Sequence, residues 1–258
     1  IKILTQPINK LAKQLTELKP DIIAVAAYGQ LLGKEILKIP RLGCLNIHPS
    51  LLPKYRGPSP IQAPILNGDT ETGVTIMRLV EKMDAGPIVA QSRIKLNGSE
   101  TAGDLHNMLA RKGARLLIQT LGKTPFSERA QNKAQATYTK KINARDAELS
   151  LKEPAFMLER KIRAYNPSPG MFVKITNIEN KPDIFNHKPM RLKMWRAKIK
   201  KNAHNARSFT PDKNLIIIDK LPALLCGDGN FLILTEVQPE GKKRMSGEEF
   251  VRGYMRRE

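Results

Sequence analysis

Two side chains suited to carbonyl chemistry stand close together near residue 47. Asn46 and His48 are two positions apart at the end of a short apolar run, residues 43–47, and the chain then enters a proline-rich stretch, residues 49–60. On a strand, positions i and i+2 share a face, so a carboxamide and an imidazole would lie side by side. The amide could stabilise a developing oxyanion, and the imidazole could move a proton near neutral pH. A lone histidine at a strand end is also a common structural hydrogen-bonding group, so the pair alone leaves both interpretations open.

Asp84 is a third candidate for the same chemistry. It follows a predicted strand at residues 72–79, in the sequence Met83-Asp-Ala-Gly86. Ligands of open α/β sheets bind beyond the carboxyl ends of the strands, where Asp84 could meet Asn46 and His48. A carboxylate beside an imidazole fixes its tautomer and raises its pKa, which favours proton transfer. Taken alone, Asp84 also fits an ordinary turn, since Asp, Ala and Gly are typical of loops.

The elements around these residues alternate between helices and buried strands. Apolar residues at 8, 11, 15 and 18 have helical spacing, and residues 21–27 form a continuous apolar run, as in a strand buried on both faces of a parallel sheet. A short helix near residues 32–39 precedes the strand at 43–47. Further strands are predicted at 72–79 and 88–94, and a helix begins at Thr101. This order predicts an α/β domain with a parallel, Rossmann-like sheet over residues 1–125.

The second half of the chain has a different pattern. Residues 126–146 are polar with few large apolar side chains, which predicts an extended linker. A helix around residue 158 and a turn at Gly227-Asp-Gly229 are predicted beyond it. Short strands recur throughout and indicate a small OB-like β-barrel over residues 147–258. The predicted strands are 171–176, 190–198, 215–218, 223–226 and 231–237.

The charge of the chain is strongly positive, with 44 Lys and Arg against 24 Asp and Glu, or +20. Before residue 127 there are 17 basic and 9 acidic residues, and after it 27 and 15, so both halves are basic. This excess favours a polyanionic partner, most commonly nucleic acid. An aromatic content of 5% argues against a stacking platform and favours contacts to the phosphates of a folded RNA. Any one of these basic residues, taken alone, is best interpreted as a solvated surface charge. The candidates for RNA contact, taken as a set, are Lys54, Arg56, Lys140, Lys141, Arg145, Lys200, Lys201, Lys242, Lys243 and Arg244.

Several classes of protein are disfavoured by the sequence. No apolar run reaches the roughly 18 residues needed to span a bilayer, and no signal peptide is evident. Cys44 and Cys226 lie in different predicted domains without partners at metal-ligand spacing, which favours reduced thiols. One site histidine with scattered acids makes no ligand set, so we expect no metal. We expect a cytoplasmic monomer. The sequence begins at Ile1, without Met and within a run that looks like the middle of an element, so we also expect a missing upstream segment.

Motifs along nearly the whole chain resemble the formyltransferase family that uses 10-formyltetrahydrofolate. The second half is more specifically similar to members of that family that act on methionyl-tRNA. The chain departs from the family at Ser168, where a Trp is more usual, and at its start, where the first strand and helix of the family and a basic loop would stand. The similar segments are Asn46-Ile-His48, Ser50-Leu-Leu-Pro-Lys-Tyr-Arg-Gly-Pro58, Thr72-Gly-Val-Thr-Ile-Met77, Met83-Asp-Ala-Gly86, Leu221-Pro-Ala-Leu-Leu225, Gly227-Asp-Gly229 and residues 236–246.

The resemblance implies a formyltransferase domain in which Asn46, His48 and Asp84 are catalytic. It implies 10-formyltetrahydrofolate as co-substrate and initiator methionyl-tRNA as partner, with the α-amino group of the esterified methionine formylated for translation initiation. Formyl transfer to an amino sugar or other small amine, and an inactive RNA-binding fragment, remain alternatives; the basic C-terminal half argues against a small amine. The residues implied to line the folate site are Ser50, Leu51, Leu52, Pro53, Tyr28, Gly29, Gln30, Val80 and Met83.

Overall fold

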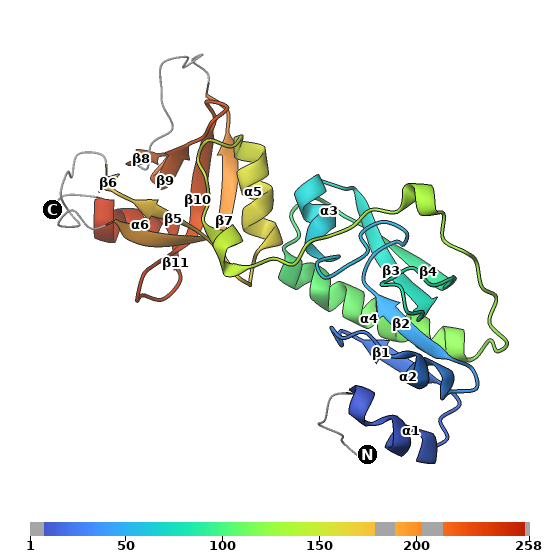
Figure 1. The fold of residues 1–258 in the computed structure, drawn as a ribbon. Coiled ribbons are helices and arrows are strands. Elements are labelled where there is room, and N and C mark those ends of the chain that lie inside the picture. Colours follow the sequence, from blue (N-terminus) through green and yellow to red (C-terminus); the bar gives the residue numbers. More distant parts are fainter. Residues whose placement is uncertain (1–7, 179–188, 203–213, 256–258) are drawn as a thin grey trace. The chain divides into compact units, whose positions relative to one another are not determined.

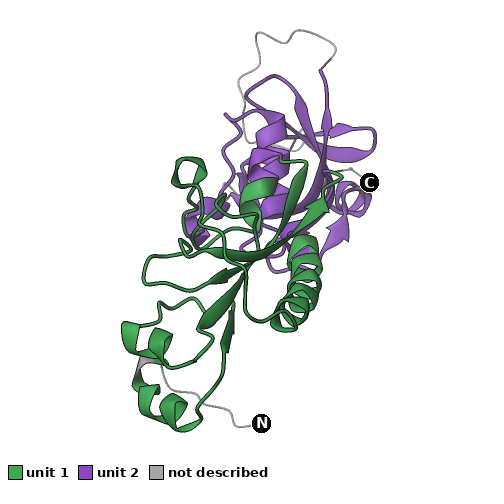
Figure 2. Cartoon of the chain, turned by 90° about the vertical axis from the view of Figure 1, so that its right-hand side faces the viewer, with its two compact units in different colours: residues 1–64, 69–97, 104–141 green, residues 65–68, 98–103, 142–258 purple. Residues whose placement is uncertain are grey.

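The computed structural model describes residues 8–178, 189–202 and 214–255 of the chain (Figure 1). Within it the chain divides into two compact units, coloured separately in Figure 2. The first unit comprises residues 1–64, 69–97 and 104–141, and the second comprises residues 65–68, 98–103 and 142–258. The first unit therefore extends to residue 141, within the stretch that the sequence marks as a linker.

The first unit is built on a four-stranded sheet in the order β1-β2-β3-β4. Its strands are β1 (Ile23–Ala26), β2 (Cys44–His48), β3 (Glu71–Arg78) and β4 (Ile88–Lys95). The α/β class is confirmed, and the sheet is mixed: β1 and β2 are parallel, whereas β3 and β4 are antiparallel to their neighbours. In the described part of the chain β1 is an edge strand of half-buried and exposed residues, so its apolar run does not mark burial on both faces.

The helices of this part are η1 (Ile8–Lys10), α1 (Ala12–Glu17), α2 (Lys34–Lys38), α3 (Gln62–Asn67) and α4 (Ala102–Leu121). Leu32, Ile36 and Cys44 form a small core with side chains of the α1 region packed around it. Helix α4 approaches β2 and β3 closely at Gly113, where an added Cβ would lie 2.7 Å from the Ile47 side chain (Figure 1). A glycine is therefore needed at this point for the helix to pack against the two strands that carry the candidate site.

Residues 126–141, which we call the crossing segment, run along the first unit as extended chain with one short turn, η2 (Lys133–Gln135). Arg129 forms two backbone hydrogen bonds with Ile88 at the start of β4, both 2.8 Å long. Further along, the Arg56 amide donates to the Thr137 carbonyl, and the Arg56 carbonyl accepts from the Thr139 amide. These bonds fix the crossing segment against the loop that follows β2.

The second unit is dominated by β-structure, as predicted. Its sheet has the order β5-β7-β10-β9-β8-β6, with β11 added beside β10. Every pair is antiparallel except β6 and β8. Because β6 continues almost directly from β5, the two ends of the sheet meet in one stretch of chain, which closes it as a barrel. The strands are β5 (Met171–Ile175), β6 (Asn177–Ile178), β7 (Met190–Lys200), β8 (Asn214–Ile218), β9 (Leu221–Leu225), β10 (Phe231–Pro239) and β11 (Met245–Ser246), and the helices are η3 (Ala144–Ala147), α5 (Ala155–Ala164), α6 (Gly247–Phe250) and η4 (Val251–Met255).

Candidate active site

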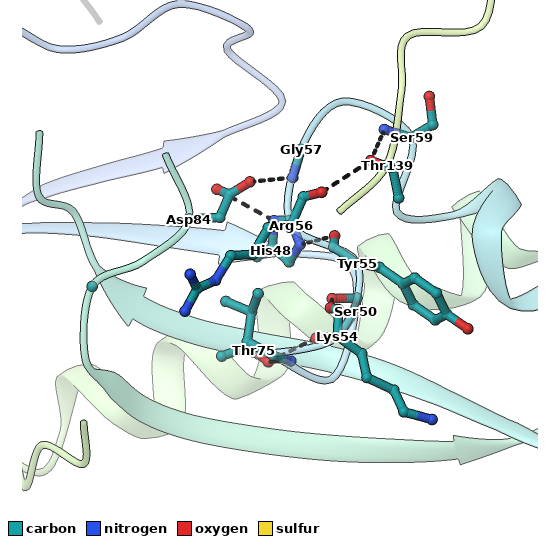
Figure 3. A network of polar contacts seen from close by, with 12 residues as sticks. His48, Ser50, Lys54, Tyr55, Arg56, Gly57, Ser59, Thr75, Asp84 and Thr139 are labelled. Carbon is teal, nitrogen blue, oxygen red and sulfur yellow. Dashed lines mark hydrogen bonds and ion pairs between the residues drawn. The ribbon is translucent and has the colours of Figure 1, made fainter. Parts of the chain in front are cut away.

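His48 ends strand β2 and is only 3% exposed. Its Nε2 atom lies 3.0 Å from the backbone carbonyl oxygen of Tyr55. A carbonyl can only accept, so Nε2 carries the hydrogen and the tautomer is fixed. Its other nitrogen, Nδ1, lies 3.6 Å from Oδ1 of Asp84 (Figure 3). The ring is thus anchored through one nitrogen and presents the other to a carboxylate.

The pKa of His48 is lowered from its ordinary value of 6.5, and burial is the largest cause. The negative charge of Asp84 and the hydrogen bond to Tyr55 act in the opposite direction, while the positive charge of Arg56 lowers the pKa further. The predicted effect of Asp84, which raises this pKa, is therefore confirmed, but burial of the ring outweighs it and the net shift of the pKa is downward. At neutral pH the ring is uncharged, with the Nδ1 lone pair ready to accept a proton.

Asp84 reaches His48 by a route that differs from the one predicted. Because β3 runs antiparallel to β2, the carboxyl end of β3 lies beside the amino end of β2, where the Leu79 amide donates to the Cys44 carbonyl. The loop after β3 therefore has to fold back along β2 to bring Asp84 to its far end. Asp84 takes up a left-handed φ of +48°, and its Oδ2 accepts a 2.7 Å hydrogen bond from the Gly57 amide.

Asn46 lies on the same strand as His48 and, at spacing i+2, on the same face of the sheet. It is half-buried. Over residues 8–178, 189–202 and 214–255, no group hydrogen-bonds its side-chain amide. An amide that is held on a rigid strand without a protein partner is available to donate to a bound carbonyl oxygen.

Gln131 is a residue of this site that sequence reasoning missed. Its Nε2 donates to the backbone carbonyls of Asp84 (2.8 Å) and Gly86 (2.7 Å), and its Oε1 accepts from Nη2 (2.6 Å) and Nε (3.1 Å) of Arg56. One amide thus ties the Asp84 loop to Arg56 in the loop after β2. A single glutamine in a polar stretch gives no signal in sequence, and only the packing of the crossing segment reveals it.

The loop with the predicted folate residues Ser50 to Pro53 is held by internal hydrogen bonds. Ser50 Oγ donates to the Lys54 carbonyl, and the Ser50 carbonyl accepts from Thr75 Oγ1. The backbone of Leu52 is bound on both sides, by Thr75 Oγ1 and by Gln91 Nε2. Ser50 and Leu52 are buried, whereas Leu51 and Pro53 are half-buried at the surface of the loop.

The other predicted folate residues lie on two loops, one after β1 and one after β3. Three exposed apolar side chains, Tyr28, Val80 and Met83, occur there. An ion pair of 3.3 Å between Lys34, at the start of α2, and Glu81 connects the two regions. Gly29 has a φ of +69°, and the Tyr28 hydroxyl donates to Gln30 Oε1. These loops offer apolar surface for a flat ring.

The basic residues predicted to contact RNA are divided between the two units. Arg56 is buried, while the others are exposed. Lys200 pairs with Asp219, and Arg244 pairs with Glu236 while stacking on Trp195. In the first unit lie Lys54, Arg56, Lys140 and Lys141, and in the second Arg145, Lys200, Lys201, Lys242, Lys243 and Arg244.

Two further properties of the described residues bear on function. They include no group of three or more His, Cys, Asp and Glu side chains placed to hold a metal ion. None of their helices has both the length and the apolar character required to cross a bilayer.

The chain matches two family models, Formyl transferase over residues 5–121 and Formyl transferase, C-terminal domain, over residues 141–255. It is 37% identical to the methionyl-tRNA formyltransferase of Natranaerobius thermophilus, covering 95% of this chain and 76% of that protein. For the same enzyme of Bacillus subtilis the identity is 36%, covering 97% and 74%. The fold and the sequence define a formyl-transferring enzyme. The chain belongs to the formyltransferase family.

Solved structures support the fold. HypX from Aquifex aeolicus in complex with tetrahydrofolic acid has a TM-score of 0.64 at 18% identity, covering 95% of this chain and 41% of that chain. WlaRD, a sugar 3N-formyl transferase, has a TM-score of 0.58 at 23% identity, covering 94% and 79%. At this level of identity the likeness extends to the fold and not to the substrate.

Proposed function

We propose that the chain transfers a formyl group from 10-formyltetrahydrofolate to the α-amino group of methionine esterified to initiator tRNA. Support for the acceptor comes from relatives named methionyl-tRNA formyltransferase, one of which, from Roseiflexus castenholzii, is 40% identical and covers 93% of this chain. The observation that carries the chemistry is the grouping of His48 Nδ1 and Asp84 Oδ1, 3.6 Å apart, on the same face of β2 as Asn46, whose amide is bound by no residue that the structure describes.

The folate site is proposed to lie beside this group, at the loops after β1, β2 and β3. The exposed side chains of Tyr28, Val80 and Met83 would cover the apolar faces of the pterin ring, while backbone groups of the same loops would bind its polar edge. Leu51 and Pro53 would border it from the loop after β2. When bound, the folate supplies a formyl group that is already activated for transfer.

His48 is proposed to act first as a base. Its ring is neutral, and Nε2–H is occupied by the Tyr55 carbonyl, so Nδ1 is the atom that accepts the proton lost by the attacking amine. The carboxylate of Asp84 stabilises the imidazolium that results. His48 then holds a proton at Nδ1 that it can return to the departing nitrogen.

Asn46 is proposed to stabilise the negative charge that develops on the formyl oxygen during attack. Its side-chain amide needs no reorganisation, because it is not bound to any other described residue and is fixed on strand β2. Once His48 is protonated, the positive charge of its ring also favours this negative charge, while its two N–H groups stay directed at Tyr55 and Asp84. A preorganised donor of this kind typically contributes about 100- to 1000-fold in rate.

The test is formyl transfer from 10-formyltetrahydrofolate to charged initiator methionyl-tRNA and to free methionine, measured at low and moderate salt. We expect transfer to the charged tRNA alone, with binding that weakens steeply as salt rises. Transfer to free methionine or to an amino sugar at a comparable rate would contradict the proposal. tRNA binding without any transfer would instead favour an inactive RNA-binding protein.

A further inference from the structure

A cavity of about 320 Å³ opens in the first unit beside the loop that carries Asp84. Its lining includes three cationic side chains, Arg56, Lys82 and Lys133, together with Gln131 and the ring of Tyr138. Lys82 and Lys133 are exposed. Except for Arg56, none of these cations is among the residues that sequence reasoning singled out. Three positive charges around one cavity indicate an anionic ligand.

Arg56 is the buried cation of this cavity, with only 3% of the residue exposed. Its guanidinium donates to Gln131 Oε1 from Nε and Nη2 and to the Tyr138 hydroxyl from Nη1. A guanidinium has five N–H donors, so two remain. Both protein partners are neutral, and no carboxylate in the described ranges pairs with Arg56. Burying a charge without an opposite charge is costly, and a bound oxyanion would complete the site.

The ring of Tyr138 indicates which class of anion fits this cavity. Its side chain is 65% exposed, yet the ring is held in place, because its hydroxyl accepts from Arg56 and the guanidinium carbon lies 5.8 Å from the ring centre. A fixed, exposed aromatic ring beside phosphate-binding cations is the arrangement on which unpaired bases stack. A carboxylate, such as the glutamate of folate, would use the cations but not the ring.

The cavity also adjoins the candidate catalytic group. Gln131 contacts Arg56 through its oxygen and the Asp84 carbonyl through its nitrogen, so one side chain separates the cavity from the candidate catalytic group. We propose that this cavity binds a phosphate and a base of the unpaired nucleotides at the 3′ end of the RNA. The assignment rests on the proposed function, because it assumes a tRNA acceptor.

The decisive experiment compares two proteins with two RNAs in a binding assay without chemistry. The cavity variant is Lys82→Ala with Lys133→Ala, and the matched control is Lys95→Ala with Lys123→Ala, which also removes two exposed lysines of the first unit. The RNAs are uncharged initiator tRNA and the same tRNA lacking its last three nucleotides. We expect the cavity variant to lose about tenfold in affinity for the complete tRNA and far less for the shortened one. The control should weaken both RNAs slightly and equally.

The ring is tested by Tyr138→Leu and Tyr138→Phe. Phenylalanine keeps the stacking surface and removes only the hydroxyl that accepts from Arg56. We expect leucine to cost about tenfold for the complete tRNA, within the range of base–aromatic stacking, and phenylalanine far less. Equal losses in both variants would mean that the hydrogen bond, and not the ring, matters, which overturns the stacking assignment.

Three outcomes would separate this inference from its alternatives. Equal loss for both RNAs in the cavity variant would assign the lysines to the paired part of the RNA and overturn the proposal. A loss of affinity for tetrahydrofolate triglutamate, with tRNA binding unchanged, would assign the cavity to the folate tail and also overturn it. If the unaltered protein binds neither RNA, the proposed function itself is refuted.

Discussion

The surroundings of His48 in the first unit and of Trp195 in the second show two ways of using charge. Around His48 the charged groups are few and mostly enclosed: Asp84 has a 14% exposed side chain and Arg56 is buried, and both are fixed by hydrogen bonds. Around Trp195 the cations stack on the ring, with the guanidinium carbon of Arg244 3.5 Å and Lys193 Nζ 5.4 Å from its centre. Enclosed charges change the pKa of a neighbour, whereas surface cations act together at longer range.

Because their charges are placed so differently, the two regions should respond to different perturbations. Geometry at the scale of one ångström governs the His48 region, because proton transfer requires atoms in hydrogen-bonding reach. The barrel surface should be tolerant of single substitutions and sensitive to salt.

The largest effect is expected from Asn46→Ala and His48→Ala. Each removes a group that acts on the reacting atoms, so the single-turnover rate of formyl transfer should fall by about 100- to 1000-fold or more. Affinity for tRNA should change little, because neither side chain belongs to the basic surface. An unchanged rate in a folded variant would refute the catalytic assignment.

A smaller loss is expected from Gln131→Leu, which removes the hydrogen bonds to Asp84, Gly86 and Arg56 while keeping similar bulk. A displacement of about 1 Å in the Asp84 loop would cost roughly 100-fold in kcat. Gln135→Leu, at an exposed position of the same segment, is the control and should leave kcat unchanged. The acid limb of the pH profile should also shift in Gln131→Leu, which a purely structural defect would not produce.

The pH dependence should report His48. Its pKa is below 6.5, and the ring must be neutral to accept a proton, so the transfer rate should fall on the acid side with a midpoint below 6.5. In Asp84→Asn the charge that raises this pKa is lost, so the midpoint should move to lower pH as the maximal rate drops. A midpoint above 6.5 in the unaltered protein would contradict the role of burial.

The lowered pKa of His48 also affects the stability of the fold. Between the lowered pKa and 6.5 the unfolded chain binds a proton that the folded chain does not, so the free energy of unfolding should decrease as the pH falls through this interval. Denaturant titrations at several pH values measure this slope. The slope should be smaller in His48→Gln, which has no ring to protonate.

The smallest effect is expected on the barrel, from Lys242→Ala with Lys243→Ala. Both lysines are exposed, and each would contribute at most about one phosphate contact, so tRNA affinity should fall only a few-fold and the salt slope by about one to two units. The rate from a saturated complex should not change. A large loss of kcat in this variant would remove the contrast between the two regions.

Much of this arrangement could be predicted from local sequence. The spacing of Asn46 and His48 gives their common face, and the short strands separated by turns indicate a β-rich second half. Three features could not be predicted, since each depends on packing between distant segments: the antiparallel direction of β3, the net pKa of His48, and the contacts of Gln131. A pKa reflects both the burial of the group and the charges around it. A carboxylate in the sequence indicates a nearby charge but says nothing about burial.

The course of the crossing segment limits how this enzyme could be divided or recombined. A polypeptide ending at Pro125 would keep Asn46, His48 and Asp84 but lose Gln131, which lies 47 positions beyond Asp84. We therefore expect that a single proteolytic cut within residues 126–141 would lower the rate of transfer while leaving most of the fold intact. We expect that any fusion or domain exchange that is to keep the site intact must carry the chain up to Lys141, so that Gln131 stays with the Asp84 loop.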